Sequence, residues 1–520
     1  MRVLHVSSEL APFAQSGGLA DVVAGLPLAQ AAGGADVAVI VPLYRGVAAQ
    51  LAVANRVLGE PIALPLEVGP HRFDAALRIV DTGQLRFAFV DYPPLFDRDG
   101  GLYGPGGPSE FDDNPLRFAV LGRAAIAAGV PLFGGDPDVL HLHDWQTGLA
   151  AVYARAAGSR SAIVTTIHNL AYRGIFPKAV MDELGIPWSL FTTDKLEFYD
   201  QVSFLKAGLG LADAVTTVSP TYAREILTPE RGEVLDAFLR DDIGHVHGIV
   251  NGIDTAAWDP AHDPALPAPY SRTQIAGKAK CRRALALEAR LPHLADHEAL
   301  IGVVSRMTDQ KGLDLIADLA PELHSLGARL VVLGAGEPDL EARFRYLAET
   351  FHDHVSTTIG FDIGFAHRIY AGCDLFVMPS RFEPCGLGQL YAMRYGSIPI
   401  VHAVGGLRDT VIDLDHVALA PIIPGPRLNP GPSIPGLGAV AGQLSIDAPA
   451  PPPGAANGVV FEAATTDALR AAISRAIAVF RDPPAFATLR NAAMARDSSW
   501  TKSASEYIAL YRELVAARRV

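Results

Sequence analysis

Cysteine is scarce in this sequence of 520 residues, with only Cys281, Cys373 and Cys385. An odd count without a short paired spacing argues against a disulfide framework and a cysteine-based zinc site. The first residues, a short apolar run with one basic side chain, do not form the pattern of a signal peptide. No stretch approaches the roughly 18 consecutive apolar residues of a membrane span. These absences predict a soluble, cytoplasmic protein.

Basic residues are also in deficit, at 43 against 56 acidic ones, which gives a formal net charge of −13. This balance argues against a general nucleic-acid-binding surface but leaves room for a local basic pocket for a phosphorylated ligand. Hydrophobic residues, by contrast, make up 49% of the chain, which is enough for packed cores and excludes general disorder. At roughly 100–200 residues per domain, the length predicts two or three domains.

Short apolar runs that end at turns indicate buried parallel strands in both halves of the chain. They are residues 2–6, 35–41, 85–91, 139–142, 162–167 and 214–218, and then 300–305, 329–333, 355–359, 375–378 and 398–401. Helical segments alternate with them, for example at 19–32, 115–128, 313–326 and 340–350. The pattern predicts an α/β fold with two Rossmann-like, doubly wound domains facing a deep cleft.

The two halves meet near residue 250. We expect an N-terminal domain at 1–250, a C-terminal domain at 251–485 and a closing segment at 486–520. Residues 421–457 break the pattern, because they are rich in proline and glycine and lack a helical period. We interpret them as an irregular surface insertion, with a partner-binding loop as the alternative.

Two glycine turns have the arrangement of anion-binding sites. Gly17 and Gly18 follow the first strand and open a helix, where backbone N–H groups attract anionic oxygens. Gly405 and Gly406 repeat this order of strand, glycine pair and helix in the second half. One turn from each domain predicts a phosphate site divided between them, although a single such turn also fits a purely structural role.

Charged residues follow two strands of the second half. Arg306 and Lys311 come directly after the strand at 300–305, where an arginine fork and a lysine charge suit a diphosphate. Two solvated surface cations are the alternative. Glu383 follows the strand at 375–378, where a carboxylate binds sugar hydroxyls, stabilises a cationic centre or only favours the start of a helix.

Histidines end two strands of the first half. His141 and His143 fall on one strand face, a spacing that serves a metal, and His168 ends the next strand. A metal-dependent hydrolase is therefore a rival interpretation, for which Asp144 is a further candidate ligand. Histidines hydrogen-bonded at the rim of a cleft explain the pattern equally well.

Taken together, the motifs resemble those of the bacterial glycogen synthase and plant starch synthase family. They stand in the family's order and span nearly the whole chain outside 421–457. They are residues 16–21 (SGGLAD), 143–145 (HDW), 166–172 (TIHNLAY), 202–208 (VSFLKAG), 218–223 (VSPTYA), 251–254 (NGID), 305–312 (SRMTDQKG), 379–386 (PSRFEPCG) and 405–410 (GGLRDT).

The resemblance implies a GT-B fold whose C-terminal domain, 251–485, binds the nucleotide-sugar and whose last helix crosses back to the first domain. It also implies transfer of glucose from a nucleotide-glucose to the non-reducing end of an α-1,4-glucan, with retention and with no metal or other cofactor. The single-unit, bacterial-like organisation favours ADP-glucose over UDP-glucose as the donor.

The resemblance also implies roles for individual residues. Arg306 and Lys311 are expected at the donor diphosphate, and Glu383 at the transferred glucose. His168 is expected in the glucosyl pocket and Asp144 near the reacting centre. The other expected substrate-binding residues are Gln15, Ser16, Gly17, Gly18, Asp21, Asn169, Asn251, Phe361, Cys385, Gly386, Gly405, Gly406 and Leu407.

The chain departs from the family pattern at a few positions. Gln15 stands where the family has lysine, Ser16 where threonine is usual and Gly388 where threonine is frequent, while Phe361 lies where an aromatic ring stacks on the base. Loss of the lysine removes one cation from the diphosphate site. A catalytically weakened glucan-binding relative is therefore a second alternative beside the hydrolase.

Overall fold

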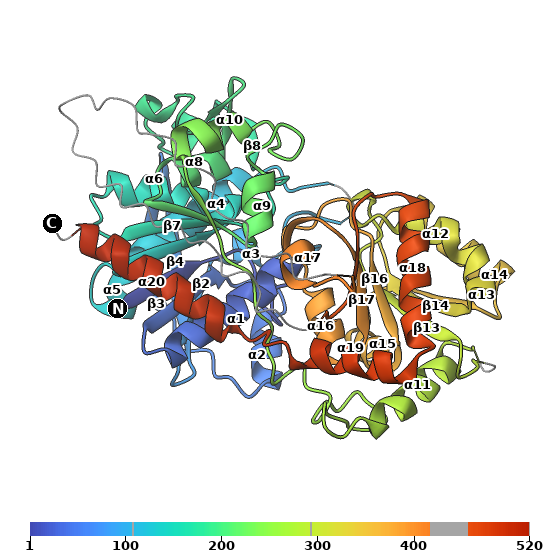
Figure 1. Ribbon diagram of the computed structural model, residues 1–520. Coiled ribbons are helices and arrows are strands. Elements are labelled where there is room, and N and C mark those ends of the chain that lie inside the picture. Colours follow the sequence, from blue (N-terminus) through green and yellow to red (C-terminus); the bar gives the residue numbers. More distant parts are fainter. Residues whose placement is uncertain (107–108, 292–293, 416–455, 519–520) are drawn as a thin grey trace.

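The computed structural model describes residues 1–106, 109–291, 294–415 and 456–518, which form two lobes (Figure 1). The predicted insertion at 421–457 lies outside the described residues except for its last two. Each lobe is an α/β unit on its own, mainly parallel sheet, so the predicted fold class is confirmed.

The N-terminal lobe is built on a nine-stranded sheet. Its strand order is β12 (Val246–Gly248), β11 (Ala214–Thr217), β7 (Ala162–Ile167), β6 (Val139–His143), β1 (Arg2–Val6), β2 (Asp36–Pro42), β5 (Arg86–Asp91), β4 (His71–Asp81) and β3 (Ile62–Val68). The strands from β12 to β5 are parallel, and β4 and β3 extend the edge as an antiparallel hairpin. The hairpin was not predicted, because its residues alternate between exposed and buried instead of forming buried runs.

Helices and a small second sheet surround this nine-stranded sheet. The helices are α1 (Gly18–Ala32), α2 (Val47–Val53), α3 (Pro93–Phe96), α4 (Asn114–Ala127), α5 (Gly129–Phe133), α6 (Gly148–Ala156), α7 (Val180–Glu183), α8 (Phe204–Gly210), α9 (Pro220–Glu225) and α10 (Asp236–Phe238). The small sheet consists of β8 (Ile175–Pro177), β10 (Gln201–Ser203) and β9 (Glu197–Phe198).

One helical stretch of this lobe, residues 114–133, is long and apolar enough to cross a membrane by composition alone. Most of it is buried inside the lobe, where Phe118, Val120 and Leu121 of α4 belong to the hydrophobic core. Burial in that core accounts for its apolar composition.

The C-terminal lobe is built on a six-stranded parallel sheet. Its order is β15 (Val355–Ile359), β14 (Ala328–Gly334), β13 (Ala299–Val304), β16 (Leu375–Met378), β17 (Ile398–His402) and β18 (Val459–Phe461). The helices are α11 (Ala276–Glu288), α12 (Leu313–Leu319), α13 (Leu323–Leu326), α14 (Pro338–Thr350), α15 (Ile363–Gly372), α16 (Gly388–Arg394), α17 (Gly405–Thr410), α18 (Thr466–Phe480) and α19 (Pro483–Ala495). The helix expected at 313–326 is thus divided into α12 and α13.

The chain passes between the lobes twice, and the two crossings lie side by side. Ile253 N–H donates to Ser498 O at 2.8 Å, and a Cβ at Gly252 would lie 2.6 Å from Trp500 N. The last helix, α20 (Trp500–Arg518), then packs on α1 in the N-terminal lobe, where Figure 1 shows it in red. Residues 486–495 pack in the C-terminal core instead, so the helix that crosses back is α20 alone.

Candidate active site

The candidate residues of the C-terminal lobe lie at the point where its strand order reverses. The chain runs from β13 outward to β14 and β15, then returns to β16 on the other side of β13. Lys311 follows β13 and Glu383 follows β16. In open α/β sheets, ligands bind beyond the carboxyl ends of strands at such a switch point.

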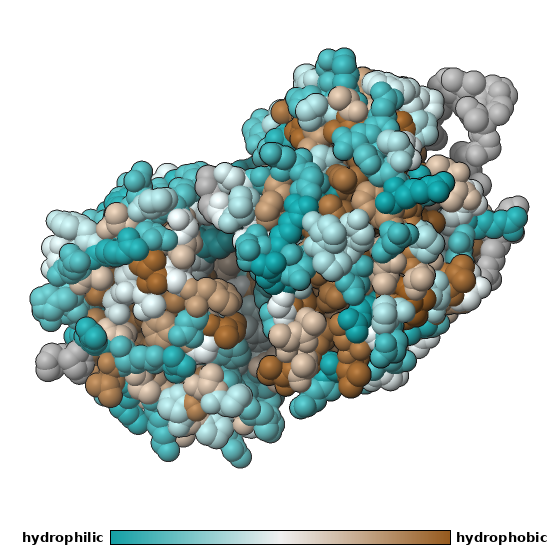
Figure 2. All heavy atoms as spheres, turned by 180° about the vertical axis from the view of Figure 1, so that it is seen from behind, coloured by the Kyte–Doolittle hydropathy of each residue, from teal (hydrophilic) through white to brown (hydrophobic). Residues whose placement is uncertain are grey.

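The N-terminal lobe has a switch point of the same kind between β1 and β6. Gly17 and Gly18 follow β1, while Asp144 follows β6 and His168 follows the neighbouring strand β7. The residues predicted from the sequence therefore gather at the ligand-binding edge of each sheet. Figure 2 shows a furrow on the surface between the two lobes.

Lys311 and Glu383 form an ion pair in the C-terminal lobe, with Lys311 Nζ 2.6 Å from Glu383 Oε2. Ser380 Oγ donates to the same carboxylate oxygen at 3.0 Å. The side chain of Glu383 is only 6% exposed and that of Lys311 17%. Arg306, in contrast, is exposed, and no described residue accepts a hydrogen bond from its guanidinium. One cation is therefore held in place, and the other is available to an anionic ligand.

The motif at Gly405 packs backbone to backbone on the motif at Glu383. Gly405 has φ +42°, and a Cβ there would lie 2.0 Å from Glu383 O, so this contact requires glycine. Gly406 N–H is shared between Glu383 O and Pro384 O, each at 3.2 Å. Leu407 is fully buried. The close contact fixes Glu383 relative to α17.

Asp144 connects the ends of β6 and β7. It is buried, has φ +57° and accepts the backbone N–H of His168 at 2.7 Å. A backbone hydrogen bond from Asn169 also reaches it, yet burial outweighs both bonds and raises its pKa to about 7. Asn169 Oδ1 accepts from Ala171 N at 3.1 Å.

In each glycine turn, a carboxylate accepts a hydrogen bond from the backbone N–H of the first glycine. Glu9, which follows β1, accepts from Gly17 N at 3.2 Å and from both the amide (2.9 Å) and the hydroxyl (2.5 Å) of Ser16. Glu225 of α9 accepts from Gly405 N at 3.0 Å. Both amides were predicted to bind phosphate, so Glu9 and Glu225 must move before the amides can do so. Glu9 lies three residues after the end of β1, and this position near a strand end was a signal for it in the sequence.

Gln15 and Asp21 lie beside this turn. Gln15 Nε2 donates to Asp21 Oδ2 at 3.1 Å. Burial, together with the neighbouring Glu9 carboxylate, raises the pKa of Asp21 to about 6. The residue that replaces the family's lysine therefore contacts Asp21, another of the expected substrate-binding residues.

Several contacts join the two groups of residues across the lobes. A Cβ at Gly18 would lie 3.9 Å from Leu387 Cδ1, so the glycine turn of one lobe reaches the loop after β16 of the other. The thiol of Cys385 is hydrogen-bonded to the backbone of Asn251, and burial raises its pKa to about 12.

Phe361, after β15, is 86% exposed and available for stacking. Gly386, with φ +71°, follows in the same loop as Cys385.

The histidines of the rival metal interpretation are buried and hydrogen-bonded. Among the described residues, His5, His141 and His143 form the group whose ligand atoms lie within 4.8 Å of one another. Every ring nitrogen of the three has a hydrogen-bond partner in the protein. A metal ion would have to displace these bonds.

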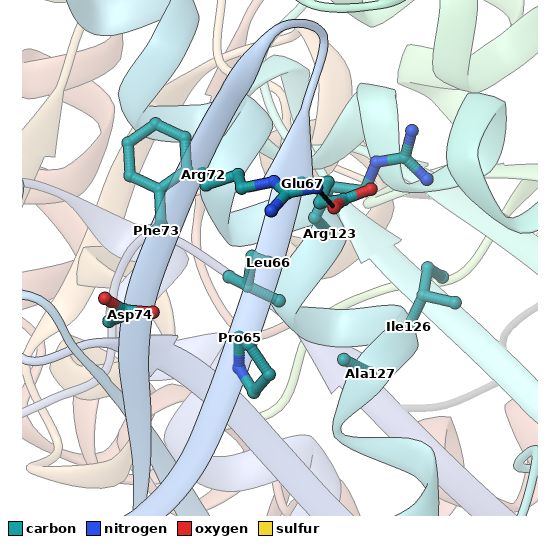
Figure 3. Close-up of a pocket in the computed structure, with 9 residues that line it drawn as sticks. All are labelled: Pro65, Leu66, Glu67, Arg72, Phe73, Asp74, Arg123, Ile126 and Ala127. Atoms are coloured by element: carbon teal, nitrogen blue, oxygen red, sulfur yellow. Dashed lines mark ion pairs between the residues drawn. The ribbon is translucent and has the colours of Figure 1, made fainter.

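A separate groove of about 570 Å³ lies between the β3–β4 hairpin and α4 (Figure 3). Its lining includes the ion pair of Glu67 and Arg72, at 3.2 Å, together with Phe73 and Arg123. None of the predicted site residues lines it.

Comparison with known proteins agrees with the geometry. Residues 2–241 match the starch synthase catalytic domain family, and residues 298–422 match the glycosyl transferases group 1 family. Glycogen synthases from Anaeromyxobacter dehalogenans and Myxococcus xanthus are 45% and 42% identical, each over 99% of this chain and 100% of the relative.

Among solved structures, the catalytic domain of starch synthase IV from Arabidopsis thaliana, bound to ADP and acarbose, has a TM-score of 0.83. It is 31% identical, over 99% of both chains. Sucrose-phosphate synthase from Thermosynechococcus elongatus, 17% identical over 99% of both chains with a TM-score of 0.57, shares the fold.

The two facing Rossmann-like lobes and these matches define a GT-B glycosyltransferase. Within that class, the chain belongs to the glycogen and starch synthase family, as the sequence motifs predicted.

Proposed function

We propose that the protein transfers glucose from ADP-glucose to the non-reducing end of an α-1,4-glucan, with retention of the anomeric configuration. The observation that carries this proposal is the Lys311–Glu383 pair at the C-terminal switch point. A cation and a carboxylate placed together suit a donor whose leaving group is anionic and whose sugar becomes cationic. The loop that follows this pair contacts the glycine turn of the other lobe through Leu387.

In this proposal, the two cations stabilise the departing diphosphate. Lys311 is preorganised by Glu383, and the exposed Arg306 closes on the phosphate when the donor binds. Bond breaking at the anomeric carbon leaves positive character on the sugar, and the bond electrons go to the phosphate oxygen. That oxygen accepts the proton of the attacking glucan hydroxyl on the same face, which retains the configuration.

The donor assignment rests on the family and on the ADP bound by the starch synthase IV relative. We further propose a cytoplasmic location, as expected from the sequence. Gln15 supports a second candidate, a weakened glucan-binding relative, because a neutral side chain lies beside Asp21 where the family has lysine.

A donor comparison tests the proposal. Purified full-length protein is incubated with glycogen and labelled ADP-glucose or UDP-glucose, with EDTA in parallel reactions. Transfer from ADP-glucose that survives EDTA is expected. Glycogen binding without transfer from either donor would favour the weakened relative, and loss of activity with EDTA would favour the metal-dependent alternative.

A further inference from the structure

Three histidines lie buried behind the candidate site. His5 of β1 and His141 and His143 of β6 are at most 1% exposed, and their ring centroids lie 4.2–5.3 Å apart. Burial lowers the pKa of His5 to about 4 and that of His168 to about 3, and the pKa values of His141 and His143 lie well below the usual value. Each ring therefore carries one N–H and one lone pair at neutral pH.

A chain of hydrogen bonds runs from Gln30 of α1 to His168. Gln30 Oε1 lies 2.7 Å from His5 Nε2, and His5 Nδ1 lies 3.0 Å from His143 Nε2. The last link joins His143 Nδ1 to His168 Nε2 at 2.9 Å. All four side chains belong to the N-terminal lobe, but His168 alone is not fully buried.

The amide of Gln30 gives this chain its direction. An amide oxygen only accepts, so His5 carries its proton on Nε2 and presents a lone pair at Nδ1. His143 must then donate from Nε2 to His5, which leaves His143 Nδ1 as an acceptor. By the same rule, His168 donates from Nε2 to His143, and its lone pair is on Nδ1. No described residue donates a hydrogen bond to His168 Nδ1.

The other end of the Gln30 amide is held by the helix that crosses back. Gln30 Nε2 donates to the hydroxyl of Tyr511 at 3.1 Å, and that hydroxyl lies 2.6 Å from His141 Nδ1. His141 Nε2 in turn lies 2.6 Å from Thr166 Oγ1. Tyr511 of α20 therefore holds the end of the amide that faces away from His5.

We propose that Gln30 is a positioning residue, which holds His168 in the Nε2–H tautomer through the two intervening histidines. His168 then offers its Nδ1 lone pair to a hydroxyl of the donor's glucose. This inference rests on the proposed function, because glucose is the group that His168 is expected to meet. Through this chain of hydrogen bonds, Gln30, which is remote from the substrate, determines which ring nitrogen of His168 is protonated.

The tautomer is measured first in the unmodified protein. Nitrogen NMR of full-length protein labelled with ¹⁵N-histidine distinguishes protonated from unprotonated ring nitrogens, and a His168→Gln variant assigns the signal. We expect His168 to be protonated on Nε2 and not on Nδ1. The opposite tautomer would overturn the proposal, because it requires the Gln30 amide to be reversed. This measurement needs no variant of Gln30 to fold.

Two substitutions of Gln30 then test causation. Gln30→Met keeps the length but removes the acceptor, so His168 is expected to populate both tautomers. Gln30→Glu keeps an acceptor for His5 and is expected to restore the Nε2–H tautomer. An unchanged His168 spectrum in Gln30→Met would overturn the proposal.

Kinetic measurements distinguish a positioning role of Gln30 from a general disruption of the fold. Loss of a defined acceptor for one glucose hydroxyl is expected to raise the KM for ADP-glucose about fivefold in Gln30→Met. The inhibition constant of ADP, which lacks glucose, should stay unchanged. An equal rise in both would indicate a merely structural role and overturn the proposal. If the unmodified protein transfers glucose from neither donor, the proposed function fails, and the tautomer spectra still decide this inference.

Discussion

Burial is the main cause of the pKa shifts of Asp144 and His168 in the candidate site. Asp144 and His168 lie together at the ends of β6 and β7, and burial disfavours the charged form of each. The pKa of the acid is raised and that of the base is lowered, so both groups tend toward neutrality. Of the five residues expected at the diphosphate, the glucose and the reacting centre, the charged ones are therefore Lys311, Glu383 and Arg306 of the other lobe.

Asp144 makes stability depend on pH in a defined direction. Its pKa rises from 3.8 to about 7 on folding, so the folded state keeps a proton that the unfolded state releases. The stability that this proton contributes is present below pH 4 and is lost as the pH rises to about 7. Each pKa unit corresponds to about 1.4 kcal/mol.

Asp144→Asn should remove this dependence. We expect the free energy of unfolding of the variant, relative to the unmodified protein, to increase between pH 4 and pH 7 and to level off above. Urea unfolding of both proteins across that pH range measures this difference. A constant difference at all pH values would show that Asp144 has an ordinary pKa.

Gln15 is the residue whose replacement should improve donor binding. Gln15→Lys places an ammonium group beside Asp21 and the glycine turn, where a diphosphate is expected. We predict a severalfold lower KM for ADP-glucose at low salt, with a smaller gain at high salt. Gln15→Met, which matches the length without the charge, should not lower it. An unchanged or higher KM in Gln15→Lys would contradict the role assigned to this position.

Among the elements, the start of α16 leaves little space for a side chain at Gly388. A Cβ at Gly388 would lie 3.2 Å from Met378 Sδ and 3.3 Å from both Phe376 Cε1 and the hydroxyl of Tyr370. The threonine that is frequent in the family therefore does not fit this chain without movement of its neighbours.

Gly388→Thr should for this reason lower the free energy of unfolding by about 1–3 kcal/mol. Thermal unfolding measures the loss. Met378→Val added to Gly388→Thr should recover part of the stability by making room. A threonine variant as stable as the unmodified protein would show that the site accommodates the family's residue.

Helices α9 and α17, one from each lobe, are joined by two carboxylates. Each carboxylate accepts hydrogen bonds at the start of the other helix. Asp409 of α17 accepts from Ser219 Oγ at 2.6 Å and from Thr221 at the amide (2.9 Å) and the hydroxyl (2.6 Å). In return, Glu225 of α9 accepts from the first amide of α17. Each helix therefore stabilises the positive end of the other.

Asp409→Asn should weaken this contact and lower the free energy of unfolding by about 1–3 kcal/mol. Glu462→Gln is the matched control, because Glu462 pairs with Arg408 at 2.9 Å but is 72% exposed and contributes little. Urea unfolding compares the two variants. Equal, small effects would mean that the contact between α9 and α17 adds no stability.

For the molecule as a whole, the sequence was sufficient to predict the central parallel strands of the two large sheets and the strand ends at which the candidate site lies, but not the β3–β4 hairpin or the edge strands β12 and β18. The predicted strand ends after β1, β6, β13 and β16 are the two switch points. The two glycine pairs, Arg306, Lys311, Glu383 and the strand-end histidines were predictable because each follows a buried apolar run, whereas the other site residues were expected only from the family resemblance.

Contacts between distant residues were not predictable. Gln30 lies in an apolar helix, and its partners are 25 and 481 positions away in the chain. Glu225 reaches Gly405 over 180 positions, so nothing near either residue indicates that the glycine amide is occupied. Sequence patterns report local structure, whereas these bonds depend on how the lobes and α20 come together.

The most direct test of the account asks whether the Lys311–Glu383 pair carries the transfer. Incorporation of labelled glucose from ADP-glucose into glycogen is measured for the unmodified protein and for Lys311→Met, with glycogen binding measured on the same samples. The account predicts transfer by the unmodified protein and a loss of about a hundredfold or more in the variant, with glycogen binding retained. Equal rates in the two proteins would contradict it.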